Sequence, residues 1–301
     1  VYSNTGLVIK GNSFINMTST TGYAIYSQYG HNTNIDANNI QANCIGILLT
    51  YENYSLSGTS NITNNLVGNF NYASYQYGFQ FQYVNNVNIL HNTIATKSIN
   101  ASNSYSCMYL YYINAATGGA VLTSSDCRNN ILIDYSTSTG GATIYGYYVN
   151  FANFNYNDYY APNGPTYFVY WINTSGTGGQ YSTLTQWQST FSTLNANSLY
   201  QVDPQIISSA NLHLAPGATG IKGTFVNILK DVDNDPRCAI LGYLGADEPY
   251  RIAGAIDFVG GSLSAAAGRD GTTFRASVVK KDFNLAMDLL ADITLHAKFA
   301  P

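Results

Sequence analysis

Charged side chains are scarce in this chain of 301 residues. Lysine and arginine together number 12, aspartate and glutamate 16, and the formal net charge is −4. Proteins that bind nucleic acid neutralise phosphates with clustered lysine and arginine, so a chain this poor in basic residues is not expected to have a nucleic-acid partner. No apolar run approaches the ~20 residues that a membrane-crossing helix needs, so no membrane span is expected either.

Cysteine and histidine are equally rare, with four of each. The cysteines stand at positions 44, 107, 127 and 238 and lack the paired C-x-x-C spacing of a zinc site, so we expect no metal and no cofactor. The chain has neither an initiator methionine nor a charged-then-apolar leader, which indicates a mature form or a fragment. Low charge combined with Asn, Thr, Ser and Tyr is typical of secreted or cell-surface bacterial proteins, and we expect that location.

Asparagine recurs at a regular spacing. The pattern is clearest in residues 89–94 and consists of an apolar residue, two free positions, Asn, one free position and a second apolar residue. Its asparagines are Asn12, Asn38, Asn65, Asn92, Asn130 and Asn157, separated by steps of 26, 27, 27, 38 and 27 residues. A fixed period of this length is typical of a stacked repeat with one supersecondary unit per period.

Short β-branched and aromatic runs lie between these asparagines, and helical spacing of apolar residues is almost absent. We expect one strand to contain the asparagine motif and another to follow glycine, as after Gly46, Gly78 and Gly146. Stacked coils place equivalent residues about 4.8 Å apart, where an Asn side chain can donate to and accept from the next coil. Asn also tolerates the left-handed conformation of a recurring turn. The predicted fold is all-β: a right-handed parallel β-helix of about 27 residues per coil.

Each repeat supplies two apolar positions for the inside of the coil, three residues before and two residues after the asparagine. The two columns are Ile9, Ile35, Ile62, Ile89, Cys127, Phe154 and Phe14, Ile40, Val67, Ile94, Leu132, Tyr159. Cys127 is therefore predicted to be a buried thiol. The step from Asn92 to Asn130 exceeds the usual 27 residues by eleven, and we expect these residues in a loop within 96–106 or 114–125.

The pattern changes after residue 160. Thr183-Leu-Thr-Gln186 has the spacing of a capping box and predicts a short helix that contains Trp187. Val202-Asp203-Pro204, Asp231-Val-Asp-Asn-Asp-Pro-Arg237 and Gly245-Ala-Asp-Glu248 follow in that order. This order resembles the closing part of secreted bacterial right-handed β-helix repeat proteins, which are related to the pectin-lyase fold. The resemblance covers about residues 1–248 and departs from the family at Pro236, Cys238 and Tyr243. It implies a solenoid domain that the segment 160–248 closes.

The composition shifts toward the C-terminus, since residues 1–200 carry eight charged side chains and residues 201–301 carry twenty. Residues 251–259 predict a helix that ends at Gly260-Gly261, and residues 262–267 and 272–279 alternate like strands. Asp282 is able to cap a second helix, with Phe283, Met287 and Leu290 on one face. We therefore expect a short α+β fragment at residues 250–301.

This fragment resembles a piece of the insulinase/pitrilysin-type metallopeptidases. The matching residues are Gly260-Gly261, Asp270-Gly-Thr272, Asp288-Leu-Leu-Ala-Asp292 and Phe299-Ala-Pro301. That family holds zinc with an inverted His-x-x-Glu-His and a later Glu, and the chain contains no His-x-x-Glu-His. The resemblance thus implies a fragment without zinc ligands, and we expect no metallopeptidase activity. We also expect that so few residues do not fold independently.

Acidic residues are too few on the coils for the usual chemistry of polysaccharide-degrading enzymes. Glycoside hydrolysis needs two carboxyl groups about 5–10 Å apart. The best cluster, Asp126, Arg128 and Asp158, is a candidate catalytic group, and an ion pair at one edge is the simpler interpretation. Asp231-x-Asp233-x-Asp235 lacks the Gly and Glu that an EF-hand loop needs at its sixth and twelfth positions, which favours a turn.

Tyrosine is abundant, with 27 copies. Alternate residues of a strand point inward, so about half of the tyrosines should lie in the core. The candidates for an exposed strip that stacks on sugar rings or on another chain are Tyr109, Tyr111, Tyr147, Tyr170 and Trp171.

The sequence favours a secreted or cell-surface scaffold that binds a polysaccharide or cell-surface glycan without catalysis. The alternative is a polysaccharide lyase or glycoside hydrolase of the same fold, which a close carboxylate pair in a groove would favour. A third interpretation is an inactive metallopeptidase remnant at the C-terminus, present by natural fusion or by misassembly. Neither the particular glycan nor the oligomeric state follows from the sequence.

Overall fold

The computed structural model divides the chain into two compact units, Val1–Pro249 and Tyr250–Pro301. The described residues are 2–17, 21–42, 45–55, 57–68, 75–98, 104–115, 125–137, 140–164, 168–215, 218, 220–237, 242–248, 260–268 and 271–295. Within these ranges, no helix combines the length and the hydropathy that crossing a membrane requires.

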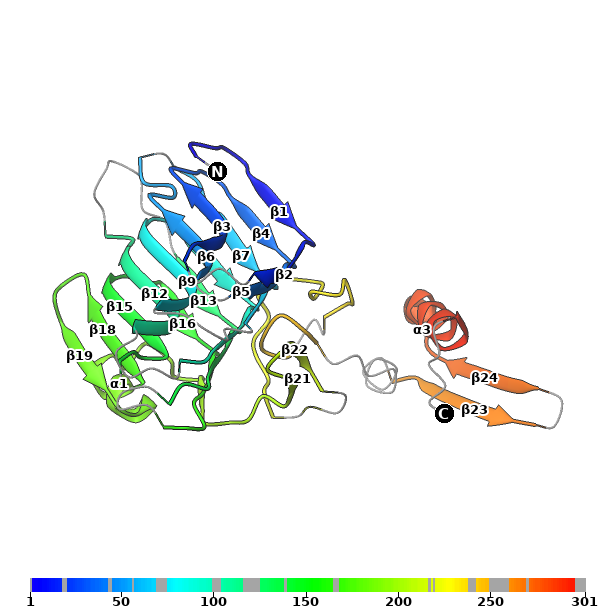
Figure 1. Ribbon diagram of the computed structural model, residues 1–301. Helices are drawn as coiled ribbons and strands as arrows, with labels where there is room; N and C mark the ends of the chain where they lie inside the picture. The colour runs from blue at the N-terminus through cyan, green and yellow to red at the C-terminus, as the bar shows by residue number, and fades with distance from the viewer. Residues whose placement is uncertain are drawn as a thin grey trace. The chain divides into compact units, whose positions relative to one another are not determined.

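Unit 1 is a parallel β-helix built from three sheets (Figure 1). The first sheet contains β1 (Val8–Lys10), β4 (Asn34–Asp36), β7 (Ser60–Thr63), β10 (Val87–Leu90), β13 (Asp126–Arg128) and β16 (Asn153–Asn155). The second contains β2 (Ser13–Met17), β5 (Asn39–Ala42), β8 (Leu66–Gly68), β11 (Thr93–Thr96), β14 (Ile131–Asp134), β17 (Asp158–Tyr160) and β20 (Leu199–Tyr200). The third contains β3 (Tyr23–Gln28), β6 (Ile45–Thr50), β9 (Tyr75–Val84), β12 (Ser104–Ile113), β15 (Ile144–Val149), β18 (Val169–Asn173) and β19 (Gly178–Tyr181).

The six asparagines of the repeat form a ladder along the corner between the first and second sheets. From Asn12 to Asn130, each side-chain Nδ2 donates to Oδ1 of the next asparagine at 2.9–3.1 Å. The backbone N–H of each donates to the same oxygen at 2.9–3.1 Å. The ladder ends at Asn157, whose N–H donates to Ser198 Oγ at 3.1 Å.

The long step between Asn92 and Asn130 leaves this register intact. The step from Val84 to Asn88 is four positions, whereas the step between their partners Ile113 and Asp126 is thirteen. Nine of the eleven extra residues therefore lie between β12 and β13. The other two lie between β11 and β12, so both expected positions receive part of the insertion.

Two details of the coil differ from the prediction. The asparagine motif joins two strands instead of forming one, because β10 ends at Leu90 and β11 begins at Thr93. The left-handed residue is the one before the asparagine, as at His91 with φ 54°, and not the asparagine itself. The preceding residue makes the bend, so the backbone N–H and the side chain of the asparagine are able to form the hydrogen bonds of the ladder.

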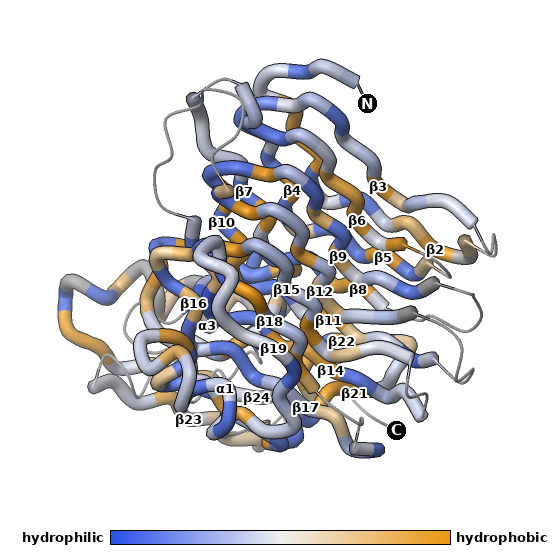
Figure 2. Tube along the Cα trace, turned by 90° about the vertical axis from the view of Figure 1, so that its left-hand side faces the viewer, coloured by the Kyte–Doolittle hydropathy of each residue, from blue (hydrophilic) through white to orange (hydrophobic). Residues whose placement is uncertain are grey.

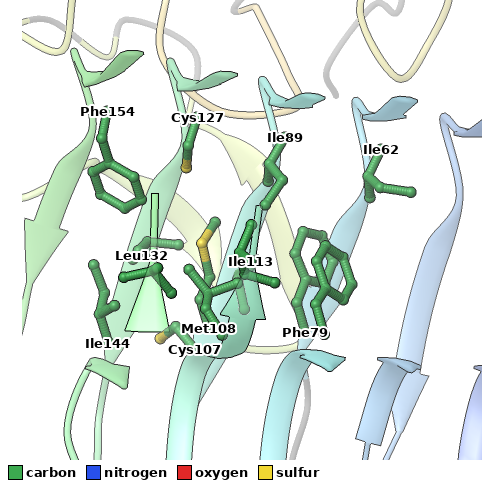
Figure 3. Close-up of a cluster of buried hydrophobic side chains, with 14 of the residues drawn as sticks. Ile62, Phe79, Ile89, Cys107, Met108, Ile113, Cys127, Leu132, Ile144 and Phe154 are labelled. Atoms are coloured by element: carbon green, nitrogen blue, oxygen red, sulfur yellow. The ribbon is translucent and has the colours of Figure 1, made fainter. Parts of the chain in front are cut away.

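Both predicted apolar columns face the interior. Figure 3 shows Ile62, Ile89, Cys127 and Phe154 in a row, opposite residues of the other sheets such as Phe79. These side chains are fully buried. Cys127 is a buried free thiol as predicted, and burial raises its pKa well above the usual value.

The C-terminal end of the core is closed by β19, which pairs antiparallel with β18, and by α1 (Leu184–Thr190). Thr183 caps α1, and the predicted capping box with Gln186 is present. Trp187 is fully buried, and its ring centroid lies 5.0 Å from that of Trp171. The helix thereby covers the last coil with aromatic side chains.

The rest of the closing segment does not extend this end cap but covers the outer face of the second sheet. It contains the hairpin β21 (Ile206–Ser208) and β22 (Asn211–Leu214), and β22 contacts β8 and β11 (Figure 2). The buried residues of this second core are Leu66, Ala95, Ile131, Ile133, Leu212, Leu214, Ala218, Ile221, Tyr243, Leu244 and Ala246. Leu66 and Ile131 on the outer side of the second sheet are apolar, and Thr93 between them accepts from Ala246 N at 2.9 Å, so this side is suited to a cover.

Arg237 anchors this cover to the ladder corner. Its buried guanidinium donates to Asn64 Oδ1 at 2.9 Å and to the carbonyls of Gly245 and Ala246 at 3.0 and 2.7 Å. Its Nη1 lies 3.6 Å from the Glu248 carboxylate. A charge this deeply buried is tolerated because both Nη groups are paired, although Nε makes no hydrogen bond within the described residues.

Unit 2 contains the antiparallel strands β23 (Ser262–Ala267) and β24 (Thr272–Ser277), the 3₁₀ turn η1 (Lys280–Asp282) and α3 (Phe283–Leu295). These are the strands and second helix expected from the sequence, with Asp282 in the turn before α3. The expected helix at 251–259 lies outside the described residues. Phe283 and Met287 are 58% and 48% exposed, whereas Ala286 is buried.

Candidate functional site

The outer face of the third sheet is rich in tyrosine and contains no charge. None of the residues in β3, β6, β9, β12, β15 and β18 is charged. We call the following residues the tyrosine face: Tyr23, Tyr26, Tyr29, Tyr51, Tyr54, Tyr77, Tyr83, Tyr109, Tyr111, Tyr112, Tyr145, Tyr147, Tyr148 and Tyr170. Most are half-buried, and Tyr23 and Tyr29 are exposed.

Strand register stacks these rings into columns. In the first column the ring centroids of Tyr109 and Tyr145 are 4.8 Å apart, and those of Tyr145 and Tyr170 are 4.7 Å apart, with interplanar angles of 4° and 12°. In the second, Tyr111 and Tyr147 stack at 5.4 Å and 11°. The two columns are neighbours, since the ring centroids of Tyr109 and Tyr111 are 6.3 Å apart and the ring planes are nearly parallel, at 15°.

A third column lies at the C-terminal ends of these strands, within the last two residues of β9, β12 and β15 and directly after β3 and β6. It consists of Tyr29, Tyr51, Tyr83, Tyr112 and Tyr148, with successive centroids 4.9–5.2 Å apart. All five have φ between 54° and 57°, the left-handed region that bulky residues rarely adopt. Each such residue costs on the order of 1–2 kcal/mol, and stacking on the next ring offsets part of that cost.

Burial and neighbouring rings raise the pKa of several phenols on the tyrosine face. Burial, and then the neighbouring Tyr109 and Tyr170, raise the pKa of Tyr145 to about 12. The pKa of Tyr109 is raised by burial and then by Tyr77. The face therefore presents neutral hydroxyl groups that donate and accept hydrogen bonds.

Four of the five predicted ligand-binding residues lie on this face, and the fifth does not. Tyr109, Tyr111, Tyr147 and Tyr170 point outward, but Trp171 is 1% exposed. The Trp171 ring packs 4.9 Å from Phe154 in the core, so its prediction as a surface ligand was wrong. The reason is strand alternation, which sends Tyr170 outward and its neighbour inward.

Sequence reasoning missed the third column. Alternation predicts that one member of each Tyr-Tyr pair points inward, as at residues 111–112 and 147–148. The left-handed turn at the second member returns it to the outside. The recurrence of Tyr at 29, 51, 83, 112 and 148, at or next to the C-terminal end of successive third-sheet strands, was the available signal.

The predicted catalytic candidates are not brought together as one group. Arg128 Nε donates to Asp126 Oδ1 at 2.7 Å on the first sheet, a surface ion pair like that of Lys10 and Asp36 at 2.7 Å. Asp158 lies on the second sheet, fully buried, and its pKa is raised to about 8, first by burial and then by Asp203. Arg128 therefore pairs with Asp126 and leaves Asp158 in a separate environment.

The aspartates of residues 231–235 form a turn. Asp231 Oδ1 accepts from the backbone N–H groups of Asp233 and Asp235 at 3.0 and 2.9 Å, and its Oδ2 accepts from Glu248 N at 3.0 Å. Both carboxylate oxygens thus organise backbone, as the turn interpretation predicts. Across the part of the chain that the structure describes, no three His, Cys, Asp or Glu side chains are grouped to hold a metal ion.

The comparisons with known proteins concern the C-terminus alone. The family model Insulinase (Peptidase family M16) matches residues 245–301. This match includes all of unit 2 and the last residues of unit 1. No curated protein matches the chain, and no solved structure does.

Proposed function

We propose that this chain is a secreted or cell-surface scaffold of the right-handed, pectin-lyase-like type that binds carbohydrate through the tyrosine face and performs no catalysis. The observation that carries the proposal is the tyrosine face itself, an uncharged outer surface with three columns of rings over successive coils. Aromatic rings and neutral hydroxyls are the groups that recognise sugars, which are themselves neutral and rich in hydroxyls.

The other two outer faces support this choice. The closing segment buries the outer row of the second sheet. The first sheet carries the isolated ion pairs Lys10–Asp36 and Arg128–Asp126. Among the described residues, the tyrosine face is the outer surface that combines many rings with the absence of charge.

The distribution of acids favours binding over cleavage. A glycoside hydrolase needs a pair of carboxyl groups on opposite sides of the scissile bond. Asp126 is engaged by Arg128, and Asp158 is covered. We therefore place catalysis by a lyase or hydrolase second to binding.

We propose that residues 250–301 are a metallopeptidase-like fragment without peptidase activity. The family match supports its origin. The missing His-x-x-Glu-His supports its inactivity.

The test compares polysaccharide binding by the natural chain with that of a variant carrying both Tyr145→Ala and Tyr147→Ala. Sedimentation with insoluble polysaccharides and affinity electrophoresis with soluble ones measure binding. Asn153→Ala, an exposed change on β16 of the first sheet, is the matched control. We expect the tyrosine variant to lose binding and the control to keep it, with unchanged circular dichroism. Equal binding by all three proteins, or release of reducing or unsaturated ends, would contradict the proposal.

A further inference from the structure

The stacking geometry restricts how a sugar can reach these rings. In a column, each ring lies offset on the next at 4.7–5.4 Å, so neighbouring rings cover much of one another's faces. What remains toward solvent is the edge of each ring, with its hydroxyl. A sugar ring therefore has little access to the flat face of a ring inside a column such as Tyr145.

Some of the hydroxyls on these edges are available and others are engaged, such as that of Tyr111 with Tyr83. Tyr26 Oη donates to Gln28 Oε1 at 2.7 Å and illustrates an engaged phenol at the N-terminal side of the face. Within the described residues, the hydroxyls of Tyr109, Tyr145, Tyr147 and Tyr170 make no such hydrogen bond and are able to bond a ligand.

The rings of the first two columns, with the hydroxyls on their edges, form a two-dimensional net. Along the solenoid the rings repeat at 4.7–5.4 Å, because the sheet sets the spacing. Across the sheet the two columns are 6.3 Å apart at Tyr109 and Tyr111. The rigid ladder of the coils holds the net in place, so its repeat does not adapt to a flexible chain.

We infer that the ligand of the tyrosine face is the surface of an ordered, neutral polysaccharide, recognised by rows of tyrosine hydroxyls rather than by stacking on ring faces. This inference rests on the proposed function and narrows its ligand. An ordered solid presents hydroxyl groups at fixed repeats, so many weak hydrogen bonds form together without ordering a flexible polymer. Neutrality follows from the absence of charge on the six strands.

The experiment measures binding of the whole chain to three materials: crystalline cellulose or chitin, soluble neutral oligosaccharides of the same sugars, and soluble acidic pectin or alginate. Two variants separate the modes of recognition. Tyr145→Phe with Tyr147→Phe removes hydroxyls and keeps rings, and Tyr145→Ala with Tyr147→Ala removes both. Tyr156→Phe, at the ladder corner with φ 52°, is the matched control for hydroxyl removal.

We expect binding to the ordered solid that is insensitive to salt and weaker by about fivefold for each hydroxyl removed. Tyr156→Phe should bind like the natural chain. If the double Phe variant binds fully while the double Ala variant does not, the rings act by their faces and the inference is wrong. Equally tight binding to soluble oligosaccharides, or salt-sensitive binding to the acidic polymers, overturns the inference and leaves carbohydrate binding standing. Binding to none of the three materials, or self-association through this face, overturns both.

Discussion

Replacing Asn92 by leucine should strongly destabilise unit 1, because this side chain forms hydrogen bonds with both neighbouring coils. Its Oδ1 accepts from the backbone N and from Nδ2 of Asn65, both at 3.0 Å. Its Nδ2 donates to Asn130 Oδ1 at 3.0 Å and to Ile62 O at 2.8 Å. Asn92 is fully buried, so water does not replace these bonds.

The expected magnitude follows from what leucine leaves behind. The backbone N–H of Asn65 loses its acceptor and stays buried, at a cost of about 1–3 kcal/mol. Four further groups, Asn65 Nδ2, Asn130 Oδ1 and the carbonyls of Ile62 and Leu90, lose one bond each but keep or regain other contacts, at about 0.5–1 kcal/mol each. Asn92→Leu should therefore lower the free energy of unfolding by about 3–7 kcal/mol.

Asn12→Leu is the matched control. Asn12 is exposed, and its side chain donates to Asn38 Oδ1 at 3.1 Å without accepting from a further coil among the described residues. Water satisfies the groups that this change leaves free, so its cost should be below about 1 kcal/mol. Denaturant titration followed by circular dichroism measures both variants. Equal losses at the two positions, or a loss below 1 kcal/mol at Asn92, would refute the ladder as a source of stability.

Four further outcomes are expected. Limited proteolysis should cut first between the two units and leave a stable product ending near Pro249, and a tail that resists as long as the coils do would contradict this. Pectin, alginate and xylan should release no new ends, and any release abolished by Asp126→Ala would assign catalysis to that residue. Since burial raises the folded-state pKa of Asp158 from 3.8 to about 8, its contribution to stability is complete below pH ~4 and lost as pH rises through about 8. Asp158→Asn should make the melting temperature less dependent on pH over that interval. An unchanged pH dependence would show that other groups cause it. Zinc titration by calorimetry should show no tight stoichiometric site, and one tight equivalent would restore a metal role for the tail.

The solenoid could be predicted because its signal is local and repeated. Ile89 and Cys127 occupy equivalent positions relative to their asparagines, so the sequence pattern already contains the sheet register. The capping box at Thr183 is likewise a four-residue signal whose two bonds form within the helix itself. Such features need no knowledge of distant residues.

The parts that the sequence did not predict depend on distant contacts or on backbone conformation. Leu66 and Ile131 occupy an outward row, and their burial comes from residues such as Leu212 and Leu244 far along the chain. The third tyrosine column depends on a positive φ at residues such as Tyr112, a conformation that tyrosine does not favour by itself. An apolar outward row in the middle coils was nevertheless a usable sign that a later segment covers it.

The outer side that the closing segment covers contributes to folding, whereas the tyrosine face is left uncovered for binding. Leu66 and Ile131 have no polar atom, and burying each contributes about 1.5–3 kcal/mol, so the closing segment stabilises unit 1 most by covering that row. Tyr145 needs no such cover, because neighbouring rings shield its faces. Loss of a hydroxyl at Tyr145 or Tyr147 should thus leave the coils as stable as before. Any loss of binding in the Phe variants then reports on recognition alone.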